Sequence, residues 1–485
     1  MTSLHAAPPA PRAAPDRRTL LHEQLLEAQF QLHDSHGAGL LLLTTGLPLA
    51  GRTETVARLV QWLNPKLLST HALPVAEGPW LAPCFRYADC VPARGRISIV
   101  YDGWYDDFLR AESGGQFTDA GRRQALASIR AFEALLAADG VKLLKLHVHA
   151  SRAHLRARLA ECEADPARRW RVQPTDVRFI KHYRREVRRI QSLQQLTSRP
   201  GATWRRLDGA LPPARLLLSA ARWLRASLRA AARWLRAAHR VPRPTRRRIV
   251  MESLPGAVAR AGVARLDRAA LERELALQSR RRAFSRRSLA VVLEGMDTAG
   301  KSTAVRRIID ALDPRQYRVI PVGSPTAEEA ARPYLHRFWT RLPEPGQITL
   351  YDRSWYGRVL VERVDGLCPA AAWRRAYGEI RQFEADLASA GVILLKFWLS
   401  VGRAEQLRRL RERATTPTKR YKLDPRDWQA RRRWWDYQLA ADEAMAATDV
   451  PAAPWTVLPA DDKPYLRLAL LNAIVMRLRS EFGPP

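Results

Sequence analysis

Apolar runs of strand length alternate along this chain with stretches in which apolar positions recur at helical spacing. In the first half, a helical pattern over Thr19–Leu32 precedes the buried-strand pattern Leu40–Thr44. In the second half, a helical pattern over Leu266–Gln278 precedes the strand pattern Leu289–Leu293. Strands that alternate with amphipathic helices predict an α/β fold, with a parallel sheet covered by helices on both faces.

The two halves follow one sequence pattern. TTGLPLAGRTETVARLVQWLNP, which ends at Pro65, aligns without a gap with LEGMDTAGKSTAVRRIIDALDP, which ends at Pro314. FEALLAADGVKLLKLHVHASRA from Phe132 aligns likewise with FEADLASAGVILLKFWLSVGRA from Phe383. The offset is 249 residues for the first pair and 251 for the second. A near-constant offset predicts a tandem duplication of one α/β domain.

Composition suggests the domain boundaries. Residues 1–17 are rich in Ala and Pro, and we expect them to be disordered. Residues 18–240 form the first predicted domain, and residues 263–485 form the second. A basic linker that contains prolines, residues 241–262, separates them.

The net charge is the unusual feature of the composition. The 485 residues include 81 Lys and Arg against 48 Asp and Glu, a formal charge of +33. Such a surface attracts nucleic acid, an acidic membrane or a phosphate polymer. Nine of the basic residues are lysines and 72 are arginines, which is equally typical of codon bias. The basic amphipathic segment Ala214–Ala238 fits a helix that binds an acidic membrane or a partner helix. The repeat favours a structural counterpart of the C-terminal helix near Tyr465–Phe482.

Other sequence features exclude several classes of protein. The hydrophobic fraction of 46% and the charged fraction of 27% are ordinary for a soluble globular protein. The apolar run Gly39–Ala50 is too short to span a bilayer, and the N-terminal sequence lacks the apolar core of a secretory signal. The cysteines show neither metal-site nor disulfide spacing: Cys84, Cys90, Cys162 and Cys368. We therefore expect a cytoplasmic protein with no membrane span.

The strongest chemical signal is a phosphate loop in the second half. EGMDTAGKST fits G-x-x-x-x-G-K-[ST] through Gly295, Gly300, Lys301 and Ser302. Glycines allow backbone N–H groups to surround a phosphate, and the helix predicted over Lys301–Leu312 presents its positive end to that anion. Lys301 adds a mobile charge, and the Ser302 hydroxyl can ligate Mg²⁺.

Two carboxylates and an arginine are expected beside this loop. The strand pattern Gln347–Asp352 ends in Asp352, at the sheet edge where α/β proteins bind ligands. Arg353 follows and can neutralise charge on a phosphoryl group. Asp297 lies inside the loop, where a carboxylate is unfavourable among phosphates unless a cation lies between them. We expect Asp297 to contact Mg²⁺ or to accept a proton from the acceptor phosphate.

A basic segment follows the strand pattern Val392–Ser400. Its helix end and loop carry Arg408, Arg411, Lys419, Arg420 and Lys422. In nucleoside-phosphate kinases, a basic lid closes over the phosphates and excludes water. For Arg408 and Arg409, however, the preferred interpretation is a solvated helix face.

Six ordered motifs resemble the second polyphosphate kinase family. They lie within Leu266–Phe482 and read EGMDTAGKST, LYDRSWYGR, GVILLKFWLS, KRYKLDPRDW, WWDYQLAADEAM and PWTVLPADDK. Thr19–Asp208 resembles the family more weakly, through the repeat, and the tandem arrangement resembles its polyphosphate:AMP phosphotransferase subgroup. The resemblance implies a P-loop kinase-like parallel sheet with helices on both faces and a helical lid, duplicated in tandem.

The resemblance also implies an activity and a site. The activity is Mg²⁺-dependent transfer of the terminal phosphoryl group of inorganic polyphosphate to AMP, which gives ADP and shortened polyphosphate. Asp297 and Asp352 would hold metal together with Ser302, and would activate the acceptor. Lys301 and Arg353 would stabilise the transferred group. The implied phosphate cradle is Gly295, Gly300, Lys301, Ser302 and Thr303, and the implied polyphosphate-binding lid is Arg411, Lys419, Arg420 and Lys422.

Other functions stay open at this point. The same chemistry can act on nucleoside diphosphates or run in reverse towards polyphosphate synthesis, and a non-enzymatic polyanion-binding protein also fits the charge. A thymidylate-kinase-like enzyme with ATP as donor shares the loop but not LYDRSWY or KRYKLDPRDW. No specific nucleic acid partner is expected, and a homo-oligomer is compatible with the sequence.

The first half has lost most of these chemical groups. The first half has Pro48 at the position of Asp297 and Arg52 at that of Lys301. It has Thr53 at the position of Ser302 and Glu54 at that of Thr303. Asp102 aligns with Asp352, but YDGWY is one residue shorter than YDRSWY, so Arg353 has no counterpart. Proline cannot ligate metal, and Arg for Lys is not conservative at a packed phosphate site. We expect a catalytically inactive half whose basic lid equivalents can still bind polyphosphate: Arg168, Arg169 and Arg171.

Overall fold

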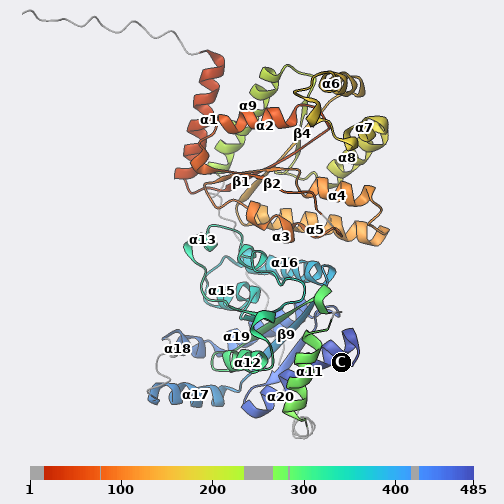
Figure 1. Cartoon of the computed structure of the whole chain (residues 1–485). Helices are drawn as coiled ribbons and strands as arrows, with labels where there is room; N and C mark the ends of the chain where they lie inside the picture. The colour runs from red at the N-terminus through yellow and green to blue at the C-terminus, as the bar shows by residue number, and fades with distance from the viewer. Residues whose placement is uncertain (1–15, 77, 234–265, 282–283, 417–424, 485) are drawn as a thin grey trace, which may run out of the picture. The chain divides into compact units, whose positions relative to one another are not determined.

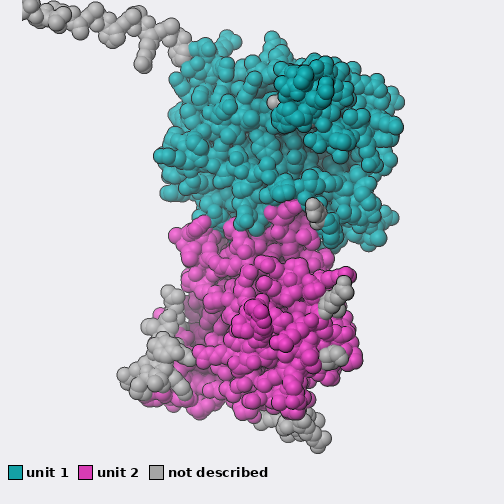
Figure 2. Space-filling model, in the orientation of Figure 1, with its two compact units in different colours: residues 1–80, 87–238, 331–333 teal, residues 81–86, 239–330, 334–485 magenta. Residues whose placement is uncertain are grey.

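The chain folds into two compact units, which Figure 2 distinguishes by colour. The structure is a computed structural model that describes residues 16–76, 78–233, 266–281, 284–416 and 425–484. The predicted disordered N-terminus, apart from its last two residues, and the predicted linker lie outside these described residues.

The first unit contains a five-stranded parallel sheet in the order β2-β3-β1-β4-β5. Its strands are β1 (Gly39–Gly46), β2 (Leu68–Ala72), β3 (Ile97–Tyr101), β4 (Val141–His149) and β5 (Trp204–Asp208). Its principal helices are α1 (Arg17–Asp34), α2 (Arg52–Gln61), α4 (Trp104–Ser113), α5 (Asp119–Ala138), α6 (Arg152–Ala164), α7 (Pro174–Lys181), α8 (Tyr183–Thr197) and α9 (Pro213–Arg233). The helices cover both faces of the sheet (Figure 1).

The second unit repeats this topology, with strand order β10-β9-β6-β8-β7. Its strands are β6 (Ser288–Gly295), β7 (Tyr317–Pro321), β8 (Ile348–Asp352), β9 (Val392–Ser400) and β10 (Trp455–Pro459). Its longer helices are α11 (Arg268–Ser279), α12 (Lys301–Ile309), α16 (Ala370–Ser389), α17 (Arg403–Thr415), α18 (Pro425–Arg432), α19 (Trp434–Thr448) and α20 (Lys463–Phe482). The predicted duplicated α/β architecture is therefore confirmed.

The sequence patterns located these elements closely. The helix predicted to start at Lys301 does so, but it ends at Ile309, three residues before the predicted Leu312. The segment compared with a membrane helix forms α9, which packs on α1 as α20 packs on α11 in the second unit. Leu217, Leu224 and Leu228 of α9 are buried in the core. The prediction that this segment is the structural counterpart of the C-terminal helix is therefore confirmed as far as Arg233, where the described part of the segment ends.

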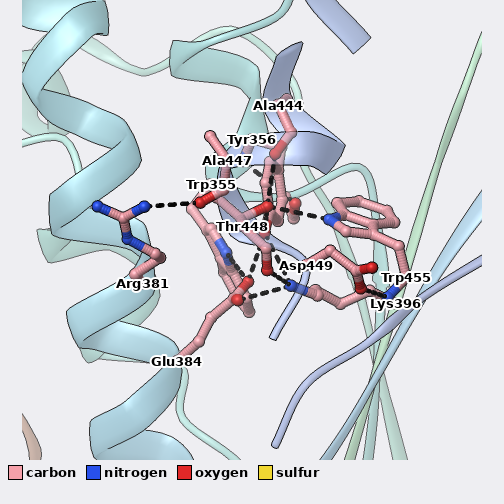
Figure 3. A network of polar contacts seen from close by, with 11 residues as sticks. Trp355, Tyr356, Arg381, Glu384, Lys396, Ala444, Ala447, Thr448, Asp449 and Trp455 are labelled. Carbon is pink, nitrogen blue, oxygen red and sulfur yellow. Dashed lines mark hydrogen bonds and ion pairs between the residues drawn. The ribbon is translucent and has the colours of Figure 1, made fainter. Parts of the chain in front are cut away.

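A buried ion pair joins the sheet to the helices in the second unit. The ammonium of Lys396 on β9 lies 2.8 Å from the Glu384 carboxylate of α16, and both side chains are fully buried (Figure 3). Trp355 Nε1 and Tyr356 Oη donate to the same carboxylate, at 3.1 and 2.8 Å. Lys396 also donates to the Thr448 carbonyl at 2.8 Å. Hydrogen bonds to both charged groups compensate for their loss of hydration.

The first unit contains the same network. Lys145 and Glu133 are buried 2.7 Å apart, and Trp104 and Tyr105 donate to that carboxylate. The Thr197 carbonyl accepts from Lys145 at 2.8 Å. Because this network is present in both units, including the one that lacks most of the predicted catalytic groups, its role is to fix the chain that follows β3 or β8.

All four cysteines are free. Among the described helices, none is long and apolar enough to cross a bilayer.

Candidate functional site

The phosphate loop of the second unit connects β6 to α12, as the motif predicts. Gly295, at the end of β6, has φ +143°, and a side chain there would place its Cβ 2.4 Å from the Leu399 carbonyl oxygen. Gly300 has φ +103° and caps the N-terminus of α12. Both positions therefore require glycine. The loop leaves the first N–H groups of α12 without helical partners, which suits an anion.

Lys301 is the first residue of α12, and its side chain turns back over the loop. Its Nζ donates to the carbonyls of Gly295 at 2.8 Å and Met296 at 3.2 Å. The residue is only 8% exposed. Burial, together with the nearby Arg353 guanidinium, lowers the pKa of the Lys301 ammonium. The ammonium is thus held at the loop that the motif assigns to phosphate.

Sheet register brings the second predicted strand to this loop. Asp352 pairs with Leu293 across β8 and β6, so its side chain lies beside the start of the loop. Ser302 Oγ donates to Asp352 Oδ2 at 3.0 Å. Arg353 Nη2 donates to Asp297 Oδ1 at 2.6 Å. The structure thus brings together the four predicted catalytic residues and Ser302.

Arg353 reaches Asp297 because the backbone turns sharply after β8. Arg353 itself has φ +66°, an uncommon conformation for a residue with a side chain. Ser354 follows it, is buried, and donates through Oγ to Glu294 Oε1 at 2.8 Å. Burial raises the pKa of the Glu294 carboxyl, and the hydrogen bond from Ser354 opposes that rise. Glu294 and Ser354 therefore hold the turn that directs Arg353.

The predicted role of Arg409 is wrong. This side chain is only 4% exposed, whereas Arg408 beside it is 60% exposed and bound to Glu405. Arg409 Nη1 donates to the carbonyl of the loop residue Thr298 at 3.0 Å. Its Nη2 donates to the carbonyls of Ala460 at 2.7 Å and Asp461 at 2.9 Å. The buried Arg409 side chain thus joins α17 to the phosphate loop, and we call it the loop clamp.

Sequence reasoning also gave no separate role to Gln406 and Tyr437. Gln406 is fully buried and donates to the backbone carbonyl of Asp297 at 3.3 Å. Burial raises the pKa of the Tyr437 hydroxyl on α19, and the Asp365 carboxylate raises it further. The charges of Asp297 and Arg353 also act on this hydroxyl. Tyr437 lies within the motif WWDYQLAADEAM, which was the available signal.

The predicted lid is only partly within the described residues. Arg411 is exposed near the end of α17, as expected for a group that can reach towards solvent. Lys419, Arg420 and Lys422 lie outside the described residues. Thr303 is exposed in the first turn of α12, beside Ser302.

At the corresponding loop of the first unit, an arginine and an aspartate form an ion pair with each other. Gly51 has φ +86° and caps α2, as Gly300 caps α12. Arg52, which aligns with Lys301, donates through both terminal nitrogens to the two carboxylate oxygens of Asp102. Asp102 aligns with Asp352, so this bidentate pair neutralises the one site carboxylate that both units carry.

The oxygen groups of the second unit suit a divalent cation. Ser302 Oγ and Asp352 Oδ2 are 3.0 Å apart, and Asp297 adds a carboxylate from the loop. Hard cations prefer carboxylate and hydroxyl oxygens, and one or two carboxylates suffice when phosphates complete the coordination. The residues present therefore fit such an ion.

A glycine loop between a parallel strand and the N-terminus of a helix is the arrangement that P-loop domains use for phosphates. The family model of polyphosphate kinase 2 matches residues 13–211 and 261–482. The chain belongs to the polyphosphate kinase 2 family.

Relatives extend over nearly the whole chain. It is 38% identical to the polyphosphate:AMP phosphotransferase of Pseudomonas aeruginosa, over 94% of this chain and 93% of that protein. It is 36% identical to the polyphosphate:AMP phosphotransferase of Pseudomonas syringae pv. tomato, over 96% and 95%. A crystal structure described as polyphosphate kinase 2 from P. aeruginosa superposes with a TM-score of 0.79 at 34% identity, covering 96% of this chain and 95% of that one.

Proposed function

We propose that this chain transfers the terminal phosphoryl group of inorganic polyphosphate to AMP and that the second unit performs the chemistry. The observation that carries the proposal is the convergence of Asp297, Lys301, Asp352 and Arg353 on one phosphate loop. The full-length relatives that share the tandem arrangement are named as polyphosphate:AMP phosphotransferases. The products are ADP and polyphosphate shortened by one unit.

The side chains divide into cations for phosphate and oxygen groups for metal and acceptor. Phosphoryl transfer depends on positioning and charge stabilisation more than on covalent catalysis. Lys301 and Arg353 stabilise charge on the transferred group, and the backbone of Gly295, Gly300, Ser302 and Thr303 cradles phosphate. One carboxylate of the Asp297 and Asp352 pair would receive the acceptor's proton.

Mg²⁺ is the proposed metal. Asp297, Asp352 and the Ser302 hydroxyl would hold it, and when bound it supplies positive charge to the phosphate oxygens. In the structure, the Arg353 guanidinium neutralises the Asp297 carboxylate through an ion pair at 2.6 Å. The lid residues Arg411, Lys419, Arg420 and Lys422 are proposed to contact the polyphosphate donor.

The first unit is proposed to be catalytically inactive. Pro48 replaces the loop carboxylate Asp297, and the Arg52–Asp102 pair consumes both the cation and the carboxylate that phosphate and metal would need. Without the loop carboxylate and without a counterpart of Arg353, the first unit lacks two of the four proposed catalytic groups.

The decisive assay mixes the full chain with polyphosphate, Mg²⁺ and either AMP or ADP, without ATP. Formation of ADP from AMP supports the proposal. Formation of ATP from ADP alone would assign the chain to nucleoside diphosphate acceptors, and the absence of any phosphorylated nucleotide would refute transferase activity.

The repeat supplies a matched pair of variants for the same assay. Lys301→Ala should lower kcat by about 10²-fold or more, because it removes a cation that stabilises the transition state. Arg52→Ala, at the aligned position of the first unit, should leave kcat unchanged. Substantial turnover by Lys301→Ala would show that the first unit is an active centre.

A further inference from the structure

One helix differs sharply in charge between the two units. Helices α8 and α19 occupy the same place in the repeat and have 15 residues each. Helix α8 carries four arginines and one glutamate, whereas α19 carries two aspartates, one glutamate and no basic residue. Both helices belong to one chain and share its codon usage, so compositional bias does not explain the contrast.

Three of the arginines on α8 are exposed: Arg184, Arg185 and Arg188. At 100° per residue they lie within one third of the helix circumference. Arg184 and Arg188 have no ion pair within the described residues, and Arg185 approaches Glu186 only to 3.9 Å. Like charges at i and i+4 repel each other, so an anion on this face would relieve the repulsion.

A fourth arginine lies on the adjoining strand, beside the neighbouring side of α8. Arg206 of β5 is exposed and lines a cavity of about 10 Å³ together with Gln191 and Gln194 of α8. Gln191 lies three residues beyond Arg188, on the same side of the helix. The position that aligns with Arg206 in the second unit is Val457, which is uncharged. We name Arg184, Arg185, Arg188 and Arg206 the arginine face.

We propose that the arginine face is a second binding site for inorganic polyphosphate, outside the catalytic unit. Guanidinium groups bind phosphate oxygens in a bidentate manner, and a row of them suits a linear polyanion. The choice of polyphosphate rests on the proposed function, because the same chain then uses this polymer as its donor. A long polymer held on the first unit stays near the second, which raises its effective concentration there.

The test compares donors of two lengths in the AMP assay, using the full chain. The test variant combines three substitutions: Arg184→Gln, Arg185→Gln and Arg188→Gln. The matched control removes three exposed arginines from other helices of the same unit: Arg17→Gln, Arg58→Gln and Arg222→Gln. The test variant should raise the KM for long-chain polyphosphate about tenfold, a modest part of what linked sites can contribute. The control should not change it.

Short-chain polyphosphate separates this proposal from the proposed function. The test variant should keep its kcat and its KM for short-chain polyphosphate and for AMP. Three results would overturn polyphosphate binding by the arginine face. They are an unchanged KM for long-chain polyphosphate in the test variant, an equal rise of this KM in the control, and a fall in the test variant's kcat with short-chain polyphosphate. Loss of affinity for duplex DNA without loss for polyphosphate would assign the face to nucleic acid instead. No turnover by the unaltered chain with either donor would refute the proposed function itself.

Discussion

Replacing Arg409 tests whether a buried arginine holds the phosphate loop. Arg409→Ala removes three hydrogen bonds to backbone carbonyls, at 2.7 to 3.0 Å, and one to Glu405 at 2.6 Å. A buried carbonyl left without its donor costs about 1–3 kcal/mol, so the loss of these bonds should destabilise the second unit by about 3–5 kcal/mol. For a unit of this size, that corresponds to a fall in Tm on the order of 10 °C. Because the Thr298 carbonyl loses its donor, kcat should also fall about tenfold.

Arg408→Ala is the matched control for this experiment. Arg408 is the adjacent residue on α17, carries the same charge and also binds Glu405, but it is 60% exposed. Exposed ion pairs contribute little to stability, so Tm and kcat should stay near those of the unaltered chain. Thermal unfolding followed by circular dichroism and the AMP assay measure both quantities. Equal effects of the two substitutions would refute the assignment of Arg409 as a loop clamp.

The remaining predictions concern buried groups in both units. Lys396→Met should destabilise the second unit by about 3–5 kcal/mol in urea unfolding, because Glu384 is left as an uncompensated buried charge. Adding Glu384→Gln should recover part of that loss, and no recovery would contradict the pairing. Ser354→Ala should lower kcat more than it changes the KM for AMP, because it frees the turn that directs Arg353; a change confined to KM would count against this role. Burial lowers the pKa of His147 to about 3, so the folded state does not take up the proton that the unfolded chain binds below about pH 6.5. Stability should therefore fall by about 2 kcal/mol between pH 6.5 and 5. In His147→Asn the loss over this range should be smaller by that amount, and an unchanged pH dependence in thermal unfolding would refute the assignment.

Local sequence patterns were sufficient for the fold and the centre of the site. The predicted strand Leu289–Leu293 lies within β6, and the predicted strand Gln347–Asp352 begins one residue before β8 and ends with it. The motif placed Gly295, Gly300 and Lys301 in the expected strand–loop–helix unit. These features depend on neighbouring residues, because glycine conformations and strand ends are set by the backbone nearby. Parallel pairing then brings the two strand ends together.

Contacts between distant segments could not be predicted in this way. The exposed Arg408 and the buried Arg409 look alike in sequence, and only the packing of α17 against the loop separates them. The bond from Ser354 to Glu294 spans 60 positions, and no local pattern pairs them. The buried pair of Lys396 and Glu384 is likewise formed between a strand and a helix.

The duplication, the α/β fold of each copy and the phosphate-loop motif can be recognised from the order of residues, because they follow from periodicity and short motifs. How each loop is used depends on contacts that form only in the folded chain. In the second unit Lys301 lies over the loop while Arg353 holds Asp297. In the first, Arg52 pairs with Asp102 through both carboxylate oxygens. Which charges pair depends on side chains that meet only when the strands align, and that alignment is a property of the folded sheet.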